Sequence, residues 1–476
     1  MVTRLLASSL AIALTLPAHL VTLHAAPDDK VFVTNGLDAG PGSFRAAIDL
    51  ANSNPLITRI QFKPDVGCVF LSNTIYYTGT QDLTIDGNRS YIEAENAGGD
   101  AFVANGGGDL EIRFLTIKNA PGEGIEVQVP PGATGTQRVR LFNVVVAGNL
   151  GHGVLINDQT DPSTPEPPLR ADETGSAASL DVVLEKSLLY ANGYSESDRD
   201  GLRVNEGGDG DLTITVKFSL AELNGADGIE VDERGNGDVI LDMFESQLVS
   251  NGSLDPEDLD DGFDIDESGP GSIVGLVAHS DAIDNYEEGF DFNENDLGDL
   301  RVDMTRVRAN GNGEEGIDLE EDDDFAGGGD LVTTMSFITA NGNFAGDGGL
   351  KIREKGDGNL LVDANEIETN DNNDGGDDLS GTSIREDAAG SLQVLLDKVE
   401  SRGNSAHGID LDENGAGDLV AEVRRTTATG NALVGLRADQ ALAGSGTLTL
   451  NKVILTGNGV APQAGSNVTT IVVPGT

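Results

Sequence analysis

The sequence predicts an all-β chain that winds into a parallel β-solenoid. A six-residue motif of a glycine, alternating apolar and variable residues and a glutamate recurs through its second half, as in Gly228-Ile-Glu-Val-Asp-Glu233 and Gly262-Phe-Asp-Ile-Asp-Glu267. In the simplest cases, such as Gly262 and Gly289, successive copies begin 27 residues apart. Repetition at a short fixed period is typical of architectures in which each repeat stacks on the previous one.

Each period contains three short segments with apolar residues at every second position. The second segment follows a glycine-rich turn, as in Asp238-Val-Ile-Leu241, and the third precedes an asparagine, as in Ser246-Gln-Leu-Val-Ser-Asn251. Alternation with period two, between Gly, Asn and Asp residues, indicates strands rather than helices. The base period of 27 residues therefore predicts one turn of the solenoid per repeat, with turns about 4.8 Å apart.

The first 25 residues predict a secretory signal peptide. Arg4 gives a positive start, the stretch from Leu5 to Leu23 is largely apolar, and Ala25 lies in a run of small residues suited to cleavage. The alternative is an uncleaved membrane anchor. No later segment approaches the roughly 18 consecutive apolar residues that a spanning helix needs. We therefore expect no membrane-spanning segment in the mature chain, and a secreted protein that is periplasmic or extracellular.

Residues 26–79 predict an N-terminal cap region with a short helix. Ser43 is a suitable N-cap for this helix. One apolar face of the helix is formed by Phe44, Ala47, Ile48 and Ala51. Such a helix would cover the core and the unpaired strand edge at the open end of the first turn. The solenoid itself is predicted over residues 80–460, and residues 461–476 predict a final strand and tail.

Asparagines recur once per period, in the turn before the motif glycine. Asn tolerates the left-handed backbone of tight turns, and its amide can bond the turns on either side. We therefore predict an asparagine ladder along the solenoid. Its predicted members are Asn149, Asn192, Asn224, Asn251, Asn285, Asn310, Asn341, Asn370, Asn404 and Asn431.

The composition excludes several classes of protein. The chain has 81 acidic and 29 basic residues and a formal charge of −52, so it cannot hold nucleic acid through phosphate contacts. The only cysteine, Cys68, excludes an internal disulfide framework and a cysteine-based metal site. Apolar residues make up 38% of the chain in regularly spaced strings, which argues against a disordered acidic tail.

The repeat resembles the right-handed parallel β-helix of the pectate-lyase-like superfamily over residues 80–460. The stretch from Val33 to Ile48, followed by Ile60-Gln-Phe62, is similar to the opening of many secreted bacterial β-helix proteins. This resemblance implies a right-handed coil. For members that act on polysaccharides it also implies Ca²⁺ or another neutralising group, together with an Arg, Lys or Tyr that removes a proton beside a uronate carboxylate.

The variable positions of the motif face outward and form columns along the solenoid that are mainly acidic. Stacked carboxylates about 4.8 Å apart repel one another by about 1 kcal/mol per pair even in water, so bound Ca²⁺ is a suitable compensation. The candidate metal ligands are Asp264, Asp266, Asp291, Asp318 and Glu320. The alternative is a solvated acidic face with diffuse counterions. A third column, of glutamates from Glu206 to Glu413, either extends this acidic face or bonds turn amides.

Basic residues interrupt the acidic columns at one place. Lys351 and Arg353 fall on one turn and Arg385 on the next, with insertions around residues 324–328 and 371–378 on either side of the first turn. They are our candidate catalytic residues, in a cleft for an acidic glycan. The alternative is a set of ion pairs between turns, each of which contributes little.

One histidine lies in a short motif that is also found in glycan hydrolases. His152 lies in Gly151-His-Gly153, which echoes a polygalacturonase motif, but the partner motifs are missing. We therefore interpret it as a turn histidine. The chain also lacks the tryptophans that commonly line sugar clefts.

These observations favour a non-enzymatic function. We expect a secreted, acidic surface or extracellular scaffold protein that associates with Ca²⁺ and engages a glycan or a cell-surface partner. The alternative is a Ca²⁺-dependent polysaccharide lyase or epimerase that acts on acidic glycans. The fold alone does not decide between them.

Overall fold

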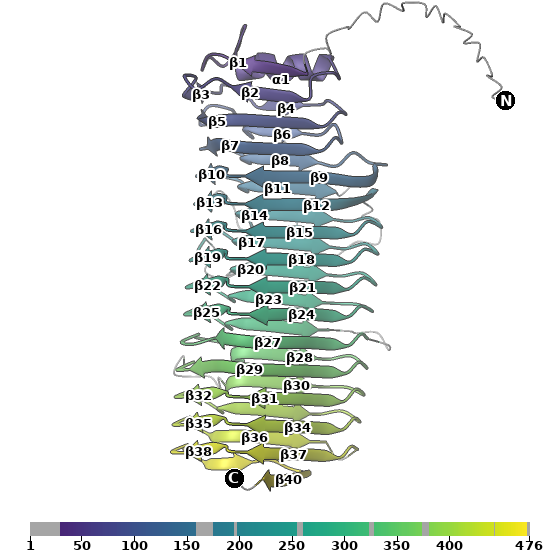
Figure 1. Ribbon diagram of the computed structural model, residues 1–476, viewed down its shortest axis with the longest axis vertical. Coiled ribbons are helices and arrows are strands. Elements are labelled where there is room, and N and C mark those ends of the chain that lie inside the picture. Colours follow the sequence, from purple (N-terminus) through teal and green to yellow (C-terminus); the bar gives the residue numbers. More distant parts are fainter. Residues whose placement is uncertain are drawn as a thin grey trace, which may run out of the picture.

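The computed structural model describes residues 29–158, 175–194, 198–254, 260–322, 328–373, 380–441 and 443–473. Over these residues the chain forms forty strands and one short helix. Figure 1 shows the strands stacked turn upon turn into an elongated solenoid, with α1 (Phe44–Ser53) at its N-terminal end. The predicted fold class is therefore confirmed. The predicted signal peptide lies outside the described residues.

One sheet, here sheet B, takes one strand from each turn, and every pairing in it is parallel. The motif strands lie in this sheet, so it counts about fourteen turns. Its strands are β4 (Ile75–Tyr77), β6 (Phe102–Ala104), β8 (Ile125–Gln128), β11 (Val154–Asp158), β14 (Leu202–Glu206), β17 (Ile229–Glu233), β20 (Phe263–Glu267), β23 (Phe290–Glu294), β26 (Ile317–Glu321), β28 (Gly348–Glu354), β30 (Ser380–Glu386), β33 (Ile409–Glu413), β36 (Val434–Gln440) and β39 (Ala461–Ala464).

The other sheet, sheet A, contains the remaining two segments of each turn, also paired in parallel. Its longer strands are β1 (Lys30–Val33), β2 (Arg59–Phe62), β5 (Leu83–Glu93), β7 (Leu110–Lys118), β9 (Thr134–Phe142), β12 (Ala177–Glu185), β15 (Leu212–Lys217), β18 (Val239–Phe244), β21 (Ile273–Ala278), β24 (Leu300–Thr305), β27 (Leu331–Thr339), β29 (Leu360–Asn370), β31 (Leu392–Asp397), β34 (Leu419–Arg424), β37 (Gly446–Asn451) and β40 (Val468–Val473). Its shorter strands are β3 (Cys68–Phe70), β10 (Val145–Ala147), β13 (Leu188–Tyr190), β16 (Leu220–Glu222), β19 (Gln247–Val249), β22 (Asp281–Ile283), β25 (Arg308–Asn310), β32 (Glu400–Arg402), β35 (Thr427–Thr429) and β38 (Ile454–Thr456).

The interior is one continuous apolar core. Ile229 and Val231 of β17, for example, are buried and stack on Phe263 and Ile265 of β20 in exact register. At the N-terminal end the ring of Phe44 on α1 lies 5.1 Å from that of Phe62. Ser43 caps this helix, because its hydroxyl accepts the backbone N–H of Ala46. No helix among the described residues is long and apolar enough to cross a membrane.

The asparagine ladder is present, but three of its ten predicted members are wrong by two residues. The side chain of Asn285 donates a hydrogen bond from Nδ2 to Oδ1 of Asn312, at 3.1 Å, and not to Asn310. The ladder then continues through Asn343 and Asn372. The three misassigned residues, Asn310, Asn341 and Asn370, instead cap one another's backbone N–H groups beside the main ladder. Asn-X-Asn sequences at these turns offered two candidates for one position.

The ladder also explains the motif glycine. A Cβ at Gly228 would lie 2.6 Å from the carbonyl oxygen of Gly262 and 2.7 Å from Nδ2 of Asn251. The asparagine amide packs directly against the start of each sheet B strand, so no side chain fits there. The glycine and the asparagine therefore recur together.

Candidate cation-binding face

Two columns of side chains run along sheet B and form the candidate site. Column 1 is the residue just before the motif glycine, and its acidic members are Asp200, Asp227, Asp261, Glu288 and Glu315. Column 2 is the first outward position of each strand, with the members Arg203, Glu230, Asp264, Asp291, Asp318 and Lys351 in register on consecutive strands from β14 to β28. Four consecutive turns, from β17 to β26, thus place carboxylates of the two columns side by side.

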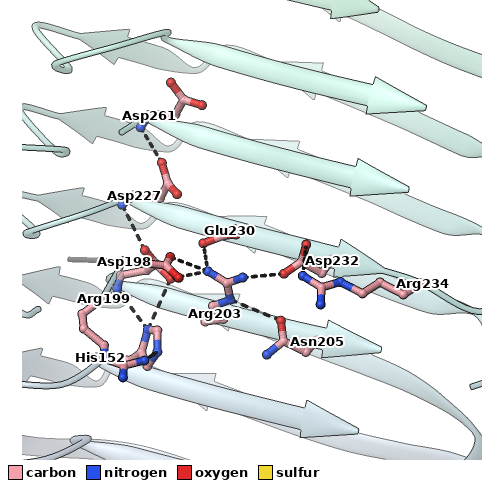
Figure 2. Close-up of polar contacts among 11 residues, drawn as sticks. His152, Asp198, Arg199, Arg203, Asn205, Asp227, Glu230, Asp232, Arg234 and Asp261 are labelled. Carbon is pink, nitrogen blue, oxygen red and sulfur yellow. Dashed lines mark hydrogen bonds and ion pairs between the residues drawn. The ribbon is translucent and has the colours of Figure 1, made fainter. Parts of the chain in front are cut away.

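The backbone holds the carboxylates of column 1 in place. Oδ1 of Asp200 accepts the backbone N–H of Asp227 at 3.0 Å, and Asp227 accepts that of Asp261. Oδ1 of Asp261 in turn accepts the N–H of Glu288 at 2.6 Å. Figure 2 shows the second of these links, with Asp227 and Asp261 one above the other along the turns. Each of these carboxylates accepts the backbone N–H through Oδ1, and the Oδ2 of Asp200 lies 3.3 Å from Nδ1 of His152.

Arg203 closes one end of the two columns. Its side chain is 2% exposed. Nη1 lies 2.8 Å from Asp198 and 3.5 Å from Asp200 and also pairs with Glu230, while Nη2 lies 2.7 Å from Asp232 (Figure 2). Burial acts against the charged guanidinium, but the surrounding carboxylates outweigh it and raise the pKa of Arg203 further above its ordinary value. This end of the site is therefore compensated by a cation of the protein itself.

Lys351 closes the other end. Its Nζ lies 2.6 Å from Asp318 and 2.6 Å from Glu320, and 3.9 Å from Glu315. Although burial lowers it, these carboxylates raise the pKa of Lys351 overall, so the ammonium group is retained. Burial raises the pKa of Asp318 to about 7 despite this partner.

The middle of the columns has no such compensation. Carboxylate oxygens of Asp261, Asp264 and Asp291 lie within 4.8 Å of one another. Within the described residues no ion pair joins these three carboxylates to a basic side chain, and Oδ1 of Asp264 and Oδ1 of Asp291 are buried without a hydrogen-bond donor. Burial, followed by repulsion from neighbouring carboxylates, raises the pKa of both aspartates well above the ordinary value.

Further groups of the same kind flank this one. Asp227, Glu230 and Asp264 form a second group, and Glu288, Glu315 and Asp318 a third, each with oxygens within 4.8 Å of one another. Across the described part of the chain, all five groups with potential metal-binding geometry contain residues of these columns. The arrangement therefore suits hard cations along one face of one sheet.

The structure places three of the five candidate metal ligands in these groups, with Asp264 and Asp291 together in one group and Asp318 in another. Asp264, Asp291 and Asp318 belong to the groups just described. Asp266 and Glu320 lie two residues further along their strands and outside these groups. Asp266 accepts a hydrogen bond from Asn295 at 3.3 Å, and Glu320 is held by Lys351 and by Lys355 at 2.5 Å.

The three candidate catalytic residues each contact carboxylates of a neighbouring turn. Lys351 pairs with Asp318, Arg353 lies 2.7 Å from Asp387, and Arg385 lies 3.7 Å from Asp412. Arg353 and Arg385 are in register on β28 and β30. The insertions that we expected to wall them fall largely on residues 323–327 and 374–379, outside the described residues.

His152 is buried beside the Arg203 end of the columns. Its Nδ1 lies 3.0 Å from the backbone nitrogen of Asp200 and 3.3 Å from Oδ2 of the same residue, and its Nε2 lies 3.1 Å from Nη1 of Arg199 (Figure 2). Burial lowers the pKa of His152 below its ordinary value, which favours a neutral ring. The ring therefore orients the Asp200 loop.

Sequence analysis missed column 1 entirely. Its residues lie outside the six-residue motif, and the candidate residues were all taken from the motif strands. A signal was nevertheless present, since an acidic residue precedes the glycine in five consecutive repeats, from Asp200 to Glu315. The buried role of Arg203 was missed as well, because a strand pattern tells which way a side chain faces but not how deeply its neighbours cover it.

Comparisons with known proteins give only distant similarities, which carry no argument about function. No family model matches the chain, and no curated protein matches it. Among solved structures, the A-module of the mannuronan C-5 epimerase AlgE4 from Azotobacter vinelandii is 14% identical with a TM-score of 0.37, over 93% of this chain and 95% of that chain. A GH87 α-1,3-glucanase catalytic domain is 12% identical with a TM-score of 0.35, over 95% of this chain and 69% of that one. The pectate lyase Pel9A is 16% identical with a TM-score of 0.29, over 92% and 78%.

Proposed function

We propose that this protein binds divalent cations, and Ca²⁺ in particular, in the two acidic columns of sheet B. The observation that carries the proposal is the group formed by Asp261, Asp264 and Asp291. Its oxygens lie within 4.8 Å of one another, and two of them are buried without a hydrogen-bond donor. Three carboxylates so close together and so little hydrated need positive charge.

The two ends of the columns support this interpretation. The carboxylates around Arg203 and those around Lys351 are neutralised by side-chain cations. The carboxylates between them have the same geometry without such a partner, so an external cation would occupy the equivalent place. Ca²⁺ suits the site because it accepts six to eight oxygen ligands in flexible geometry and tolerates water among them. Softer metals prefer the sulfur and imidazole ligands that this face lacks among its described residues.

Bound Ca²⁺ would join neighbouring turns, since Asp264 lies on β20 and Asp291 on β23. The expected result is an acidic, cation-stabilised scaffold. A secreted location and a glycan or cell-surface partner, both predicted from the sequence, belong to the same proposal. A cation-bridged acidic face would also allow a negatively charged glycan to approach a chain whose formal charge is −52.

Calorimetric titration of the protein with Ca²⁺ after chelator treatment tests the proposal. We expect saturable binding and a rise in melting temperature for the unaltered chain. The double variant Asp264→Asn, Asp291→Asn should lose much of both effects, yet be at least as stable in chelator because it removes repulsion. Asp303→Asn, on the exposed face of β24, is the matched control and should behave as the unaltered chain. Equal Ca²⁺ responses in the double variant and the control would refute the proposal.

A second candidate function is that of a Ca²⁺-dependent lyase or epimerase acting on acidic glycans. The observation that favours it is a pair of carboxyl groups whose protonation changes near neutral pH. Burial raises the pKa of Glu315 to about 8 and that of Asp318 to about 7, beside Lys351. Such groups are suited to proton transfer. Incubation with pectate and alginate in Ca²⁺ would test this function, with unsaturated or epimerised products as the readout and the Arg353→Ala, Arg385→Ala variant as comparison.

A further inference from the structure

The last position of the motif forms a separate column of glutamates, which is not part of the outer face. Each of these side chains is fully buried, because the position has the same parity as the apolar residues and closes the strand. The members of this glutamate ladder are Glu206, Glu233, Glu267, Glu294, Glu321, Glu354, Glu386 and Glu413. They are in register from β14 to β33.

Most of the ladder glutamates use one oxygen to bond a turn amide. Oε1 of Glu233 accepts the N–H of Gly235 at 2.9 Å, and Oε1 of Glu386 accepts that of Ala388 at 2.9 Å. The second oxygen of each is buried without a donor, and Glu354 has neither oxygen bonded to an N–H or O–H group. Because strands in register are about 4.8 Å apart, carboxyl groups on successive turns, such as those of Glu354 and Glu386, come into contact.

Two buried carboxylates in contact cannot both remain ionised. One of them must hold a proton and donate it to the other, or a cation must lie between them. The groups that face Glu354 are Glu321 on β26 and Glu386 on β30, and neither strand brings a basic side chain to it. At other points the ladder also meets Asp158 and Asp296. All of these groups are acidic.

At the C-terminal end of the ladder, an uncharged side chain occupies the position that a glutamate has in the other turns. Gln440 takes the ninth position, in register with Glu413. It is 2% exposed, its Oε1 accepts the N–H of Leu419 at 2.7 Å, and its Nε2 donates to the carbonyl of Gly417 at 3.0 Å. An amide that both accepts and donates has the hydrogen-bonding pattern of a protonated carboxyl group.

We propose that the glutamate ladder is a buried column of shared protons, in which protonated carboxyl groups donate hydrogen bonds to ionised neighbours on adjacent turns. The column joins the turns of the solenoid along a line separate from the acidic columns of sheet B. The column depends on bound protons. It therefore joins the turns only at pH values at which part of its carboxyl groups remain protonated.

The ionisation behaviour of the ladder agrees with this arrangement. Burial, followed by contact with Glu321 and Glu386, raises the pKa of Glu354 to about 11. Burial and contact with the neighbouring rungs likewise raise the pKa of Glu206 to about 10 and that of Glu386 to about 8. A raised pKa in the folded state stabilises the fold at low pH, and this stabilisation is lost as pH rises through the raised value. The loss therefore begins above the ordinary glutamate pKa of 4.5 and is complete only at the raised values of about 8 to 11.

Infrared difference spectroscopy at pH 8 tests the proposal. Comparison of the unaltered chain with Glu354→Gln should show the loss of a protonated carboxyl band, while Glu95→Gln, an exposed control, should show the loss of an ionised carboxylate band. Between pH 7 and 9 the unfolding equilibrium constant of the unaltered chain should rise about tenfold more per pH unit than that of Glu354→Gln.

Each contrary outcome overturns the inference. Loss of an ionised carboxylate band in Glu354→Gln would mean that this rung is charged and compensated by a cation. Failure of both Glu354→Gln and Glu386→Gln to fold would mean that an uncharged, hydrogen-bonding side chain does not replace the rung. Neither result depends on Ca²⁺ binding at Asp264 and Asp291, because both variants leave those residues unchanged.

Discussion

Replacement of Arg203 by methionine tests how the acidic columns are held together. The guanidinium is buried and contacts carboxylates from its own turn and the next, with distances of 2.8 Å to Asp198 and 2.7 Å to Asp232. Methionine keeps most of the aliphatic volume and removes the charge. The variant therefore changes the electrostatics of this end of the site more than its packing.

The expected loss of unfolding free energy follows from the carboxylates that remain around the substituted residue. Removing one partner of a buried ion pair costs about 3–5 kcal/mol, because the other partner stays buried and unpaired. Here Asp198, Asp200 and Glu230 would remain, with oxygens within 4.8 Å of one another. We therefore expect Arg203→Met to lose about 3–5 kcal/mol of unfolding free energy in chelator. The emptied position would then have the same composition as the sites we propose for Ca²⁺, so added Ca²⁺ should restore much of the loss.

Equilibrium denaturation followed by circular dichroism, in chelator and in Ca²⁺, measures both quantities. Arg301→Met is the matched control, since Arg301 is 46% exposed in its side chain and pairs with Asp299 at 2.8 Å on the surface. Its loss should stay below about 1 kcal/mol and be unaffected by Ca²⁺. A loss for Arg203→Met no larger than that of the control, or one that Ca²⁺ leaves unchanged, would refute the reasoning.

Three further predictions concern the same face and the asparagine ladder. Lys351→Met should bind about one more Ca²⁺ than the unaltered chain, because it frees the carboxylates of Asp318 and Glu315; an unchanged stoichiometry in calorimetric titration would contradict this. Ca²⁺ affinity should fall as pH is lowered from 8 to 6, because burial raises the pKa of Glu315 to about 8 and that of Asp318 to about 7, so protons compete with the metal; titrations at the two pH values measure it. Asn285→Ala should lower the free energy of unfolding, measured by urea denaturation, by about 1–3 kcal/mol, because it leaves buried ladder groups without partners. Equal losses for Asn285→Ala and Asn310→Ala would exclude the ladder as the cause.

The sequence was sufficient for the architecture because the repeat encodes it directly. Gly228, Gly262 and Gly289 mark equivalent positions, and the apolar residues between them have the period of strands. The register that this alignment implies for Glu230 and Asp264 is the observed one. The asparagine ladder was harder to place, because either Asn310 or Asn312 satisfies the turn chemistry. Only packing against Gly289, the motif glycine of the preceding turn, selects Asn312.

The alternation of residues along a strand does not predict how deeply an outward-facing side chain is buried. It places Asp318 on the outer face of its strand, where a single carboxylate would be hydrated. Its side chain is nevertheless only 5% exposed, because the columns on either side cover it. Charges packed so closely must be compensated, and the chain does so differently along its length: with Arg203 and Lys351 at the two ends of the acidic columns and, as we propose, with cations between them and protons in the glutamate ladder. The formal charge of −52 treats every carboxyl group as ionised. With Glu206 and Glu354 protonated at neutral pH, as we propose and as burial favours by raising their pKa values, the folded protein is less negative than its composition indicates.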